Sequence, residues 1–389
     1  MSSETSHQRQ NHSLPAANSS TQTPSTRKLA VVSLVTLTAA VLIALFSRDT
    51  VNLSGIRRLF GSSRATRVVT GPFPASASVP GSVTTATVAT AGAGAGTGSI
   101  SSEKQSQSSL KKMKTPVYFL SHGGPNIMYD IEHPAYRKLT EIGREITTKV
   151  KPRAVVVFSA HWQGGHDTIY VNTAEMTDLI YDFYGFPDHY YKEEYPNVGS
   201  KEVAHKVLDM LHEAHIPAEG VKRGLDHGVW ASFKCAFEPD TNPLNVPIVQ
   251  VSLFDTEDPI QHYRLGQAVS RLREENILII VSGMAVHNLR DLQFSFGNPH
   301  PLPYTASFDE ALKQAVTSAP ADRMQAMAAL FKRPDARQAH PSFDHLLPIH
   351  IGAGAAGEDL GKRLWTLGEG SMSWAQYRFG DLANASSSL

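Results

Sequence analysis

Cysteine is nearly absent from this sequence, in which Cys235 is the single example among 389 residues. One cysteine can form no internal disulfide framework, and it cannot build a zinc site from several thiolates. Cys235 lies in the largely apolar stretch 230–237, which indicates a buried helix, so we expect the thiol to have a structural role.

An excess of charge of either sign is also missing. The chain has 36 basic and 36 acidic side chains and therefore a formal net charge of zero. The field of the whole molecule would attract neither nucleic acid nor an acidic surface, so we expect no nucleic-acid partner.

Acidic residues are absent between Val51 and Ser101, inside a long leader with little sign of a core. Residues 1–28 are polar and predict a disordered tail. Residues 29–46 form an uncharged, mostly aliphatic run that spans roughly 27 Å as a helix, close to the ~30 Å hydrocarbon core of a bilayer. Residues 47–113, rich in Ala, Gly, Ser and Thr, predict a flexible linker.

This leader predicts a protein anchored in a membrane by a single pass through residues 29–46. A second interpretation stays open, because Arg57, Arg58, Arg64 and Arg67 follow the run without acidic neighbours. That pattern also suits targeting to the mitochondrion or another organelle. A third interpretation is an apolar patch with neither role.

Residues 114–382 alternate short apolar runs with amphipathic stretches, which predicts one α/β domain, followed by a tail over 383–389. We expect a central mixed, mainly parallel sheet flanked by helices. The expected strands are 117–120, 154–158, 246–254 and 277–281, and the expected long helices are 136–150, 201–215 and 260–275.

Histidine is the outlier in the composition, with 17 in the chain. His122, His161 and His287 each follow an expected strand within a few residues. Ligands of open α/β sheets bind outside the carboxyl ends of the strands. Each histidine taken alone could simply follow a strand, but three delivered to one edge predict a metal site.

A fourth candidate lies in the segment from His340 to His350. We expect Ser342 to cap a helix from whose first turn His345 projects, and we favour His345 over His340 and His350 as the ligand. The spacing of four residues found in two-histidine helical zinc motifs is missing here. His227 is expected in a turn, either facing a pocket or on the surface. The remaining histidines considered are expected to be solvated: His133, His166, His205, His212, His215, His262 and His300.

Taken in order, these motifs resemble the LigB-type class III extradiol ring-cleavage dioxygenases, in particular their 4,5-DOPA dioxygenase extradiol branch. The likeness runs from about Lys114 to Gly380, and the leader falls outside it. The motifs are Ser121-His-Gly-Gly-Pro125, Ser159-Ala-His-Trp162, Tyr181-Asp-Phe-Tyr-Gly-Phe-Pro187, Leu225-Asp-His-Gly-Val-Trp230, Val286-His-Asn288, Asp344-His-Leu-Leu-Pro348 and Ser371–Gly380.

The resemblance implies one metal ion per subunit, held by His122, His161 and His345. Where the DOPA-type branch has the third histidine, the protocatechuate-cleaving branch has a glutamate. Facial triads with a carboxylate are the usual iron(II) oxygenase arrangement. Three imidazoles suit Zn²⁺ as well as Fe²⁺, so the resemblance implies iron for activity and leaves zinc open as the bound or native metal.

The same resemblance assigns catalytic roles to His287, as a base and a candidate fourth ligand, and to His227, which would handle bound oxygen. It assigns Tyr181, Phe183 and Tyr184 to the substrate pocket. The implied reaction opens a catechol-type, DOPA-like ring with O₂. The resemblance leaves the oligomeric state open, and relatives in this family are mostly cytoplasmic.

Two other interpretations stay open. A zinc hydrolase would use the same three histidines and a metal-activated water, with Asp226 as the carboxylate base that a motif supplies. A non-catalytic metal-binding scaffold of the same fold would have lost its second-sphere histidines, whereas His227 and His287 are both present.

Overall fold

The computed structural model describes residues 114–382. The predicted tail 1–28, apolar helix 29–46, linker 47–113 and tail 383–389 lie outside the described residues. Within residues 114–382, no helix is long and apolar enough to cross a bilayer.

An eight-stranded mixed sheet forms the centre of the domain, in the order β4-β3-β5-β2-β6-β1-β11-β8. Its middle strands β5, β2, β6 and β1 are parallel, whereas β11 and β8 add to the β1 edge in antiparallel fashion. The predicted α/β class with a mainly parallel sheet is therefore confirmed. The strand bounds are β1 Val117–Ser121, β2 Ala154–Gln163, β3 Ile169–Asn172, β4 Ala218–Val221, β5 Ile248–Leu253, β6 Ile277–Gly283, β8 Gly361–Trp365 and β11 Gln376–Phe379.

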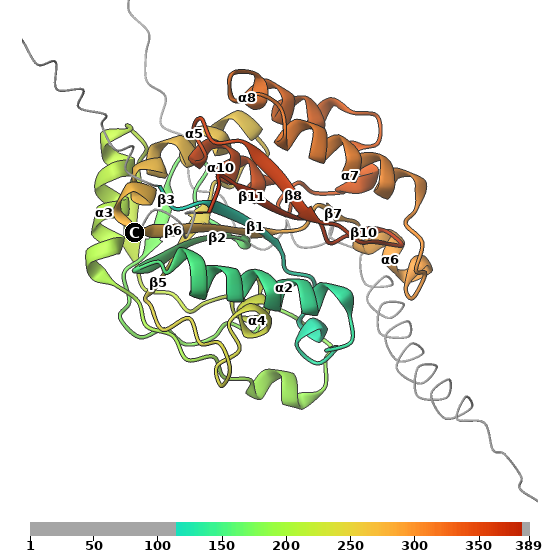
Figure 1. Cartoon of the computed structure of the whole chain (residues 1–389), viewed down its shortest axis with the longest axis horizontal. Coiled ribbons are helices and arrows are strands. Elements are labelled where there is room, and N and C mark those ends of the chain that lie inside the picture. Colours follow the sequence, from blue (N-terminus) through green and yellow to red (C-terminus); the bar gives the residue numbers. More distant parts are fainter. Residues whose placement is uncertain (1–113, 383–389) are drawn as a thin grey trace, which may run out of the picture. The chain divides into compact units, whose positions relative to one another are not determined.

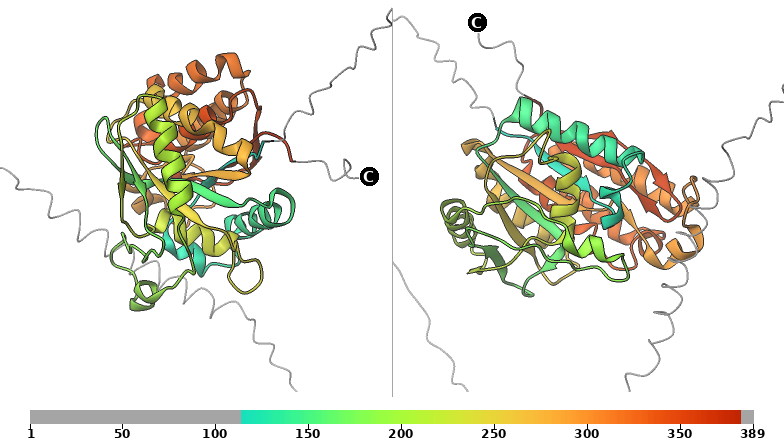
Figure 2. Two further views of the ribbon diagram at one scale, coloured as in Figure 1. Left: turned by 90° about the vertical axis from the view of Figure 1, so that its left-hand side faces the viewer. Right: turned by 90° about the horizontal axis from the view of Figure 1, so that it is seen from below.

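Helices cover both faces of this sheet (Figures 1 and 2). Side chains alternate along β1, so Val117 and Phe119 pack with one helical layer and Tyr118 and Leu120 with the other. Burial on both faces explains the uninterrupted apolar runs in the sequence. One layer holds α2 Pro134–Glu145 and α4 His227–Ala236; the other holds α3 Lys201–Glu213, α5 Pro259–Val269, α7 Pro303–Val316, α8 Pro320–Ala329 and α10 Leu347–Ala355.

A second, three-stranded sheet lies beyond the carboxyl end of β6. It consists of β7 Val286–His287, β10 Met372–Ser373 and β9 Gly368–Glu369, in the order β7-β10-β9. Short helices α6 Leu289–Ser295 and α9 Ala336–Ala339 complete the chain on this side.

Two local expectations about the histidine segments were wrong. No helix begins at Ser342: residues 341–346 form turns, and α10 begins at Leu347 with Pro348 in its first turn. A helix beginning earlier would place that proline in the interior, where its ring clashes with a preceding carbonyl. His227 is the first residue of α4 rather than part of a turn, with Asp226 at the N-cap.

His262 and His133 are also not solvated as expected. His262 is fully buried in α5, which packs closely against α10. His133 is partly buried and caps α2 by accepting a hydrogen bond from the Ala135 amide. Cys235 is buried in α4, as predicted.

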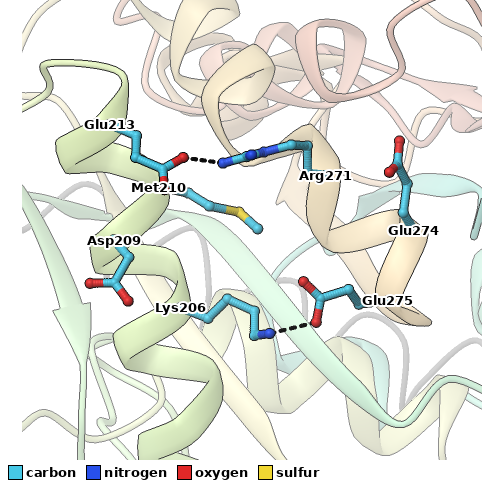
Figure 3. Close-up of a pocket in the computed structure, with 7 residues that line it drawn as sticks. All are labelled: Lys206, Asp209, Met210, Glu213, Arg271, Glu274 and Glu275. Carbon is cyan, nitrogen blue, oxygen red and sulfur yellow. Dashed lines mark hydrogen bonds and ion pairs between the residues drawn. The ribbon is translucent and has the colours of Figure 1, made fainter.

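A surface groove of about 340 Å³ lies between α3 and the 3-10 helix Ser270–Glu275 that precedes β6, at the amino end of that strand (Figure 3). Its walls are charged: Lys206 pairs with Glu275, and Arg271 pairs with Glu213. The histidine motifs lie at the opposite, carboxyl end of the sheet, so this groove is separate from them.

Candidate metal centre

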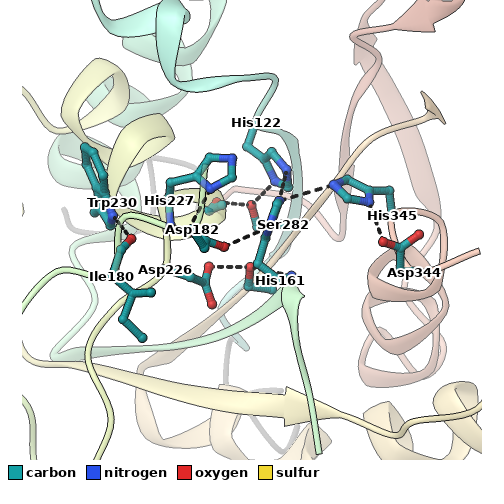
Figure 4. Close-up of polar contacts among 12 residues, drawn as sticks. His122, His161, Ile180, Asp182, Asp226, His227, Trp230, Ser282, Asp344 and His345 are labelled. Atoms are coloured by element: carbon teal, nitrogen blue, oxygen red, sulfur yellow. Dashed lines mark hydrogen bonds and ion pairs between the residues drawn. The ribbon is translucent and has the colours of Figure 1, made fainter. Parts of the chain in front are cut away.

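Three imidazoles converge at the carboxyl edge of the central sheet (Figure 4). His122 directly follows β1, His161 lies near the end of β2, and His345 comes from the turn before α10. The Nε2 atom of His161 lies 3.2 Å from that of His122 and 3.2 Å from that of His345. Ligand atoms of the three rings all lie within 4.8 Å of one another.

The opposite nitrogen of each ring is held by an oxygen. The Nδ1 atom of His161 lies 2.9 Å from Asp182 Oδ2, and that of His345 lies 3.0 Å from Asp344 Oδ2. A carboxylate only accepts, so both Nδ1 atoms carry the proton.

The tautomer of His122 follows from a hydroxyl. Its Nδ1 atom lies 2.9 Å from Ser282 Oγ, which donates its own proton to the Gly228 carbonyl. Ser282 must therefore accept from His122. All three Nε2 atoms consequently present lone pairs to one another.

Three facing lone pairs cannot hydrogen-bond among themselves, but they fit a divalent cation. Two nitrogens about 2.1 Å from an ion and 3.2 Å apart subtend about 100° at the ion, which is the spacing of ligands on one face of a metal. Metal-bound histidines typically donate their other N–H to a carboxylate or similar acceptor. The residues present therefore fit a resident metal ion.

Burial and charge act differently on the three rings. Burial lowers the pKa of His345 and holds that of His122 well below its usual range. Burial also acts to lower the pKa of His161, but the hydrogen bond to Asp182 and the charges of Asp226, Asp182 and Asp344 outweigh it and raise that pKa. The first two rings are thus neutral ligands, and the third gains basicity from its carboxylate.

Gly228 brings the start of α4 against these ligands. A Cβ atom at this position would lie 2.6 Å from Ser159 Oγ and 2.7 Å from His161 Cδ2. Any side chain here would therefore displace a ligand, which explains glycine after His227.

His227 shares its carboxylate with His161. Asp182 Oδ1 accepts from the His227 amide at 3.0 Å and from Nδ1 at 2.8 Å, while Oδ2 accepts from His161. Burial acts to raise the pKa of Asp182, but the hydrogen bonds from the two histidines outweigh it and lower that pKa, so it stays ionised. The Nε2 atom of His227 has no hydrogen-bond partner within residues 114–382 and is free for chemistry.

His287 lies beside the three ligand rings, but no oxygen of the described residues orients its ring as one orients each of theirs. Its ring stacks on His345 with centroids 3.7 Å apart, and burial holds its pKa well below the usual range. Neither ring nitrogen has a hydrogen-bond partner in the described part of the chain. The acceptor that fixes the tautomer of each ligand ring is therefore missing here.

Of the three aromatic residues predicted to line the pocket, Tyr181 and Phe183 pack together with ring centroids 6.2 Å apart, and Tyr184 lies apart from them. Phe183 is buried, with its ring centroid 5.5 Å from that of His227. The Tyr181 hydroxyl donates to the Glu193 carbonyl at 2.7 Å, and its ring packs on Trp230. Tyr184 is 82% exposed on the surface. Phe183 is therefore the member of this group that lies nearest to the histidines.

The other candidate ligands and the candidate hydrolytic base lie outside the cluster of His122, His161 and His345. His340 and His350 are fully buried: Nε2 of His340 and both ring nitrogens of His350 contact backbone carbonyls rather than the site. Asp226 accepts from Ser159 and pairs with Arg223, so it is not free to act as a hydrolytic base.

Sequence reasoning missed the carboxylates and the hydroxyl that orient the ligand rings. Asp182 lies inside the aromatic motif 181–187, between the predicted pocket residues Tyr181 and Phe183. Asp344, which opens the motif 344–348, accepts from the adjacent His345. The signal that the sequence offered for Asp182 is that it is the one acidic residue in an otherwise apolar and aromatic motif. The sequence offered no comparable signal for Ser282.

Comparisons with known proteins agree with this geometry. Residues 115–377 match the family described as the catalytic LigB subunit of aromatic ring-opening dioxygenase. The 4,5-DOPA dioxygenase extradiol of Beta vulgaris is 35% identical over 272 residues, covering 67% of this chain and 95% of the relative. A 4,5-DOPA dioxygenase extradiol-like protein of Schizosaccharomyces pombe is 34% identical, covering 61% and 84%.

A solved structure is also similar. The crystal structure of an uncharacterized protein from Escherichia coli K12 superposes with a TM-score of 0.55 at 26% identity, covering 69% of this chain and all of that one. With the family match spanning most of the chain, the conclusion is plain: this protein belongs to the LigB family and is an extradiol aromatic ring-opening dioxygenase.

Proposed function

We propose that the protein uses one non-haem iron(II) ion per subunit to open the ring of a DOPA-like catechol with O₂. The observation that carries this proposal is the convergence of three Nε2 lone pairs from His122, His161 and His345. His227 packs against His161 and His287 against His345, and each has an uncommitted ring nitrogen for the proton transfers that a diol and O₂ would need.

The ion would be held by the three imidazoles, which leave its positive charge uncompensated. When bound, it supplies a Lewis acid that lowers the pKa of the diol hydroxyls and a redox centre that lets the diol and O₂ react. Zinc fits the same ligands but lacks the redox chemistry that the reaction requires, so the metal content of a purified sample should be measured for both ions.

His287 would take a proton from a substrate hydroxyl. It is neutral because burial lowers its pKa, and its ring nitrogens are available to accept. Its stacking on His345 fixes the ring plane without occupying a nitrogen. These features favour a base over a fourth ligand.

His227 would hold and return a proton at Nε2 on the other side of the site. Burial lowers its pKa, while Asp182 opposes that effect through the hydrogen bond at Nδ1. A histidine whose pKa is subject to these two opposing effects can change its protonation state during a reaction. Phe183, packed against it, would cover the substrate ring.

Anaerobic reconstitution tests the proposal. The protein is loaded with iron(II) or with zinc, then supplied with O₂ and L-DOPA, protocatechuate or simple catechols. We expect oxygen uptake and a yellow muconic-semialdehyde-type product with iron and none with zinc. Absence of uptake with every diol would rule out the proposed reaction.

We also propose that residues 29–46 anchor the protein in a membrane. The support is their length and apolar character, together with the basic residues on either side. Membrane fractionation of the full-length protein should place it in the pellet, and a protein shortened to begin at Met113 should be released. A full-length protein in the soluble fraction, trimmed near residue 50, would favour targeting instead.

A further inference from the structure

The small sheet places a carboxylate on the same face as His287. Met372 of β10 pairs with His287 of β7 on one side and with Glu369 of β9 on the other. Directly opposed residues of antiparallel strands project to the same face. Glu369 therefore stands two strand spacings, roughly 10 Å, from His287 along the face that carries the proposed base.

A second set of contacts leads from the ligands to the same residue. Gly123, next to His122, has a φ of +64°, and a Cβ there would lie 2.0 Å from the Trp374 ring. Trp374 is thus packed against the turn that positions a metal ligand. Its indole Nε1 donates to Glu369 Oε2 at 2.9 Å, so Glu369 is connected both to the strand that carries His287 and to the turn that follows His122.

The charge of Glu369 is not neutralised by its protein partners. His133 Nε2 also approaches Oε2 at 2.9 Å. Because His133 Nδ1 accepts from the Ala135 amide, this ring carries its single proton on Nε2 and donates it as a neutral group. Within residues 114–382, no lysine or arginine forms an ion pair with Glu369.

One carboxylate oxygen remains available. Both donors use Oε2, and Oε1 has no hydrogen-bond partner among the described residues. The Glu369 side chain is 34% exposed, whereas its neighbours Trp374 and Met372 are buried. A half-buried carboxylate oriented by two neutral donors, with a free and accessible oxygen, is arranged for a cation from outside the protein.

We propose that Glu369 binds the ammonium group on the side chain of an amino-substituted catechol, while the ring diol occupies the metal centre. This inference rests on the proposed function and assigns to it a residue that selects substrates by the charge of their arm. His133 and Trp374 are the positioning residues, because both donate to Oε2 and leave Oε1 without a partner among the described residues. Catechols with an anionic arm would be repelled from the same place.

The experiment compares three catechols that differ in the charge of their arm: dopamine, 4-methylcatechol and 3,4-dihydroxyphenylpropionate. Equilibrium binding is measured calorimetrically with the iron(II) protein under anaerobic conditions, and KM is measured with O₂. The variants are Glu369→Gln, which keeps an acceptor for His133 and Trp374, and Glu358→Gln as a matched control. Glu358 is exposed in the turn after α10.

We expect Glu369→Gln to weaken dopamine binding roughly 10- to 100-fold, as for loss of a charge-assisted hydrogen bond. Binding of 4-methylcatechol should stay within about twofold of the wild type, which also shows that the variant is folded. Binding of 3,4-dihydroxyphenylpropionate to Glu369→Gln should be stronger than to the wild type. The Glu358→Gln protein should behave like the wild type with all three.

Unchanged dopamine binding in Glu369→Gln, or an equal loss with all three compounds, would overturn the assignment. Failure of the proposed function would give another result, in which no catechol supports oxygen uptake. The anaerobic binding comparison would then still decide whether Glu369 binds the ammonium group. A protein that binds none of the three compounds would contradict both.

Discussion

The imidazole of His287 lies flat against that of His345, with centroids 3.7 Å apart and planes 11° from parallel. The two rings differ in their surroundings: Asp344 holds Nδ1 of His345, and no described residue holds either nitrogen of His287. The two stacked rings are therefore prepared differently: His345 is oriented with its Nε2 toward the other ligand rings, and His287 keeps both nitrogens free of described partners.

His287→Ala should retain the metal and lose turnover. Removing a positioned acid–base group typically lowers the rate by about 10²- to 10⁴-fold. Metal content by mass spectrometry, together with oxygen uptake, measures both effects. A metal-free variant would instead make His287 a structural ligand.

His345→Ala should lose most of its metal, whereas His340→Ala should keep it. His345 faces the other two ligands, while Nε2 of His340 lies 3.0 Å from the Ala285 carbonyl. Metal content after dialysis against a weak chelator, with circular dichroism as the folding control, distinguishes the two. Full occupancy in His345→Ala would transfer the third ligand to another histidine.

Asp182→Asn should weaken metal binding and alter the pH profile of turnover. Asparagine retains one acceptor oxygen but presents an NH₂ to the second histidine, so it cannot hold both His161 and His227. Loss of such an outer partner typically costs about 10- to 100-fold in metal affinity or activity.

The matched control for that variant is Asp178→Asn, which removes the same charge at an exposed position of the same segment. It should bind metal and turn over like the wild type. Equal losses in the two variants would indicate a general charge effect and contradict a specific role for Asp182.

Buried His262 should make stability depend on pH. Burial lowers its pKa from 6.5 to about 4. Its Nδ1 lies 2.8 Å from the Asp258 carbonyl, and Nε2 has no partner, so a second proton would be buried without an acceptor. Because the folded pKa is depressed, the neutral ring favours the folded state fully above pH 6.5, and this stability is lost as pH falls from 6.5 toward 4.

Urea unfolding of the metal-free protein at several pH values measures this effect. Each pH unit in that window should remove about 1.4 kcal/mol of unfolding free energy through His262. His262→Gln should show a shallower loss, and His166→Gln, at an exposed position, should show the wild-type slope. Identical slopes in all three proteins would contradict this account.

The sequence predicted the fold class because runs such as Val155–Phe158 and Ile277–Val281 are apolar at every position, as strands buried on both faces must be. It also placed His122, His161 and His287 at one edge, since parallel strands end together. It failed for residues 341–346, where Pro348 delays the helix, and for His262, whose helix is covered by α10.

By itself, then, the sequence determined the sheet, the edge at which histidines gather, and a leader unlike the domain. Only the tertiary structure decided which nitrogen each histidine presents and which oxygen holds the other one. Asp182, Ser282 and Asp344 come from separate segments, and local periodicity carries no information about partners brought together by long-range packing. The same holds for Glu369, whose position relative to His287 depends on the register of β9, β10 and β7.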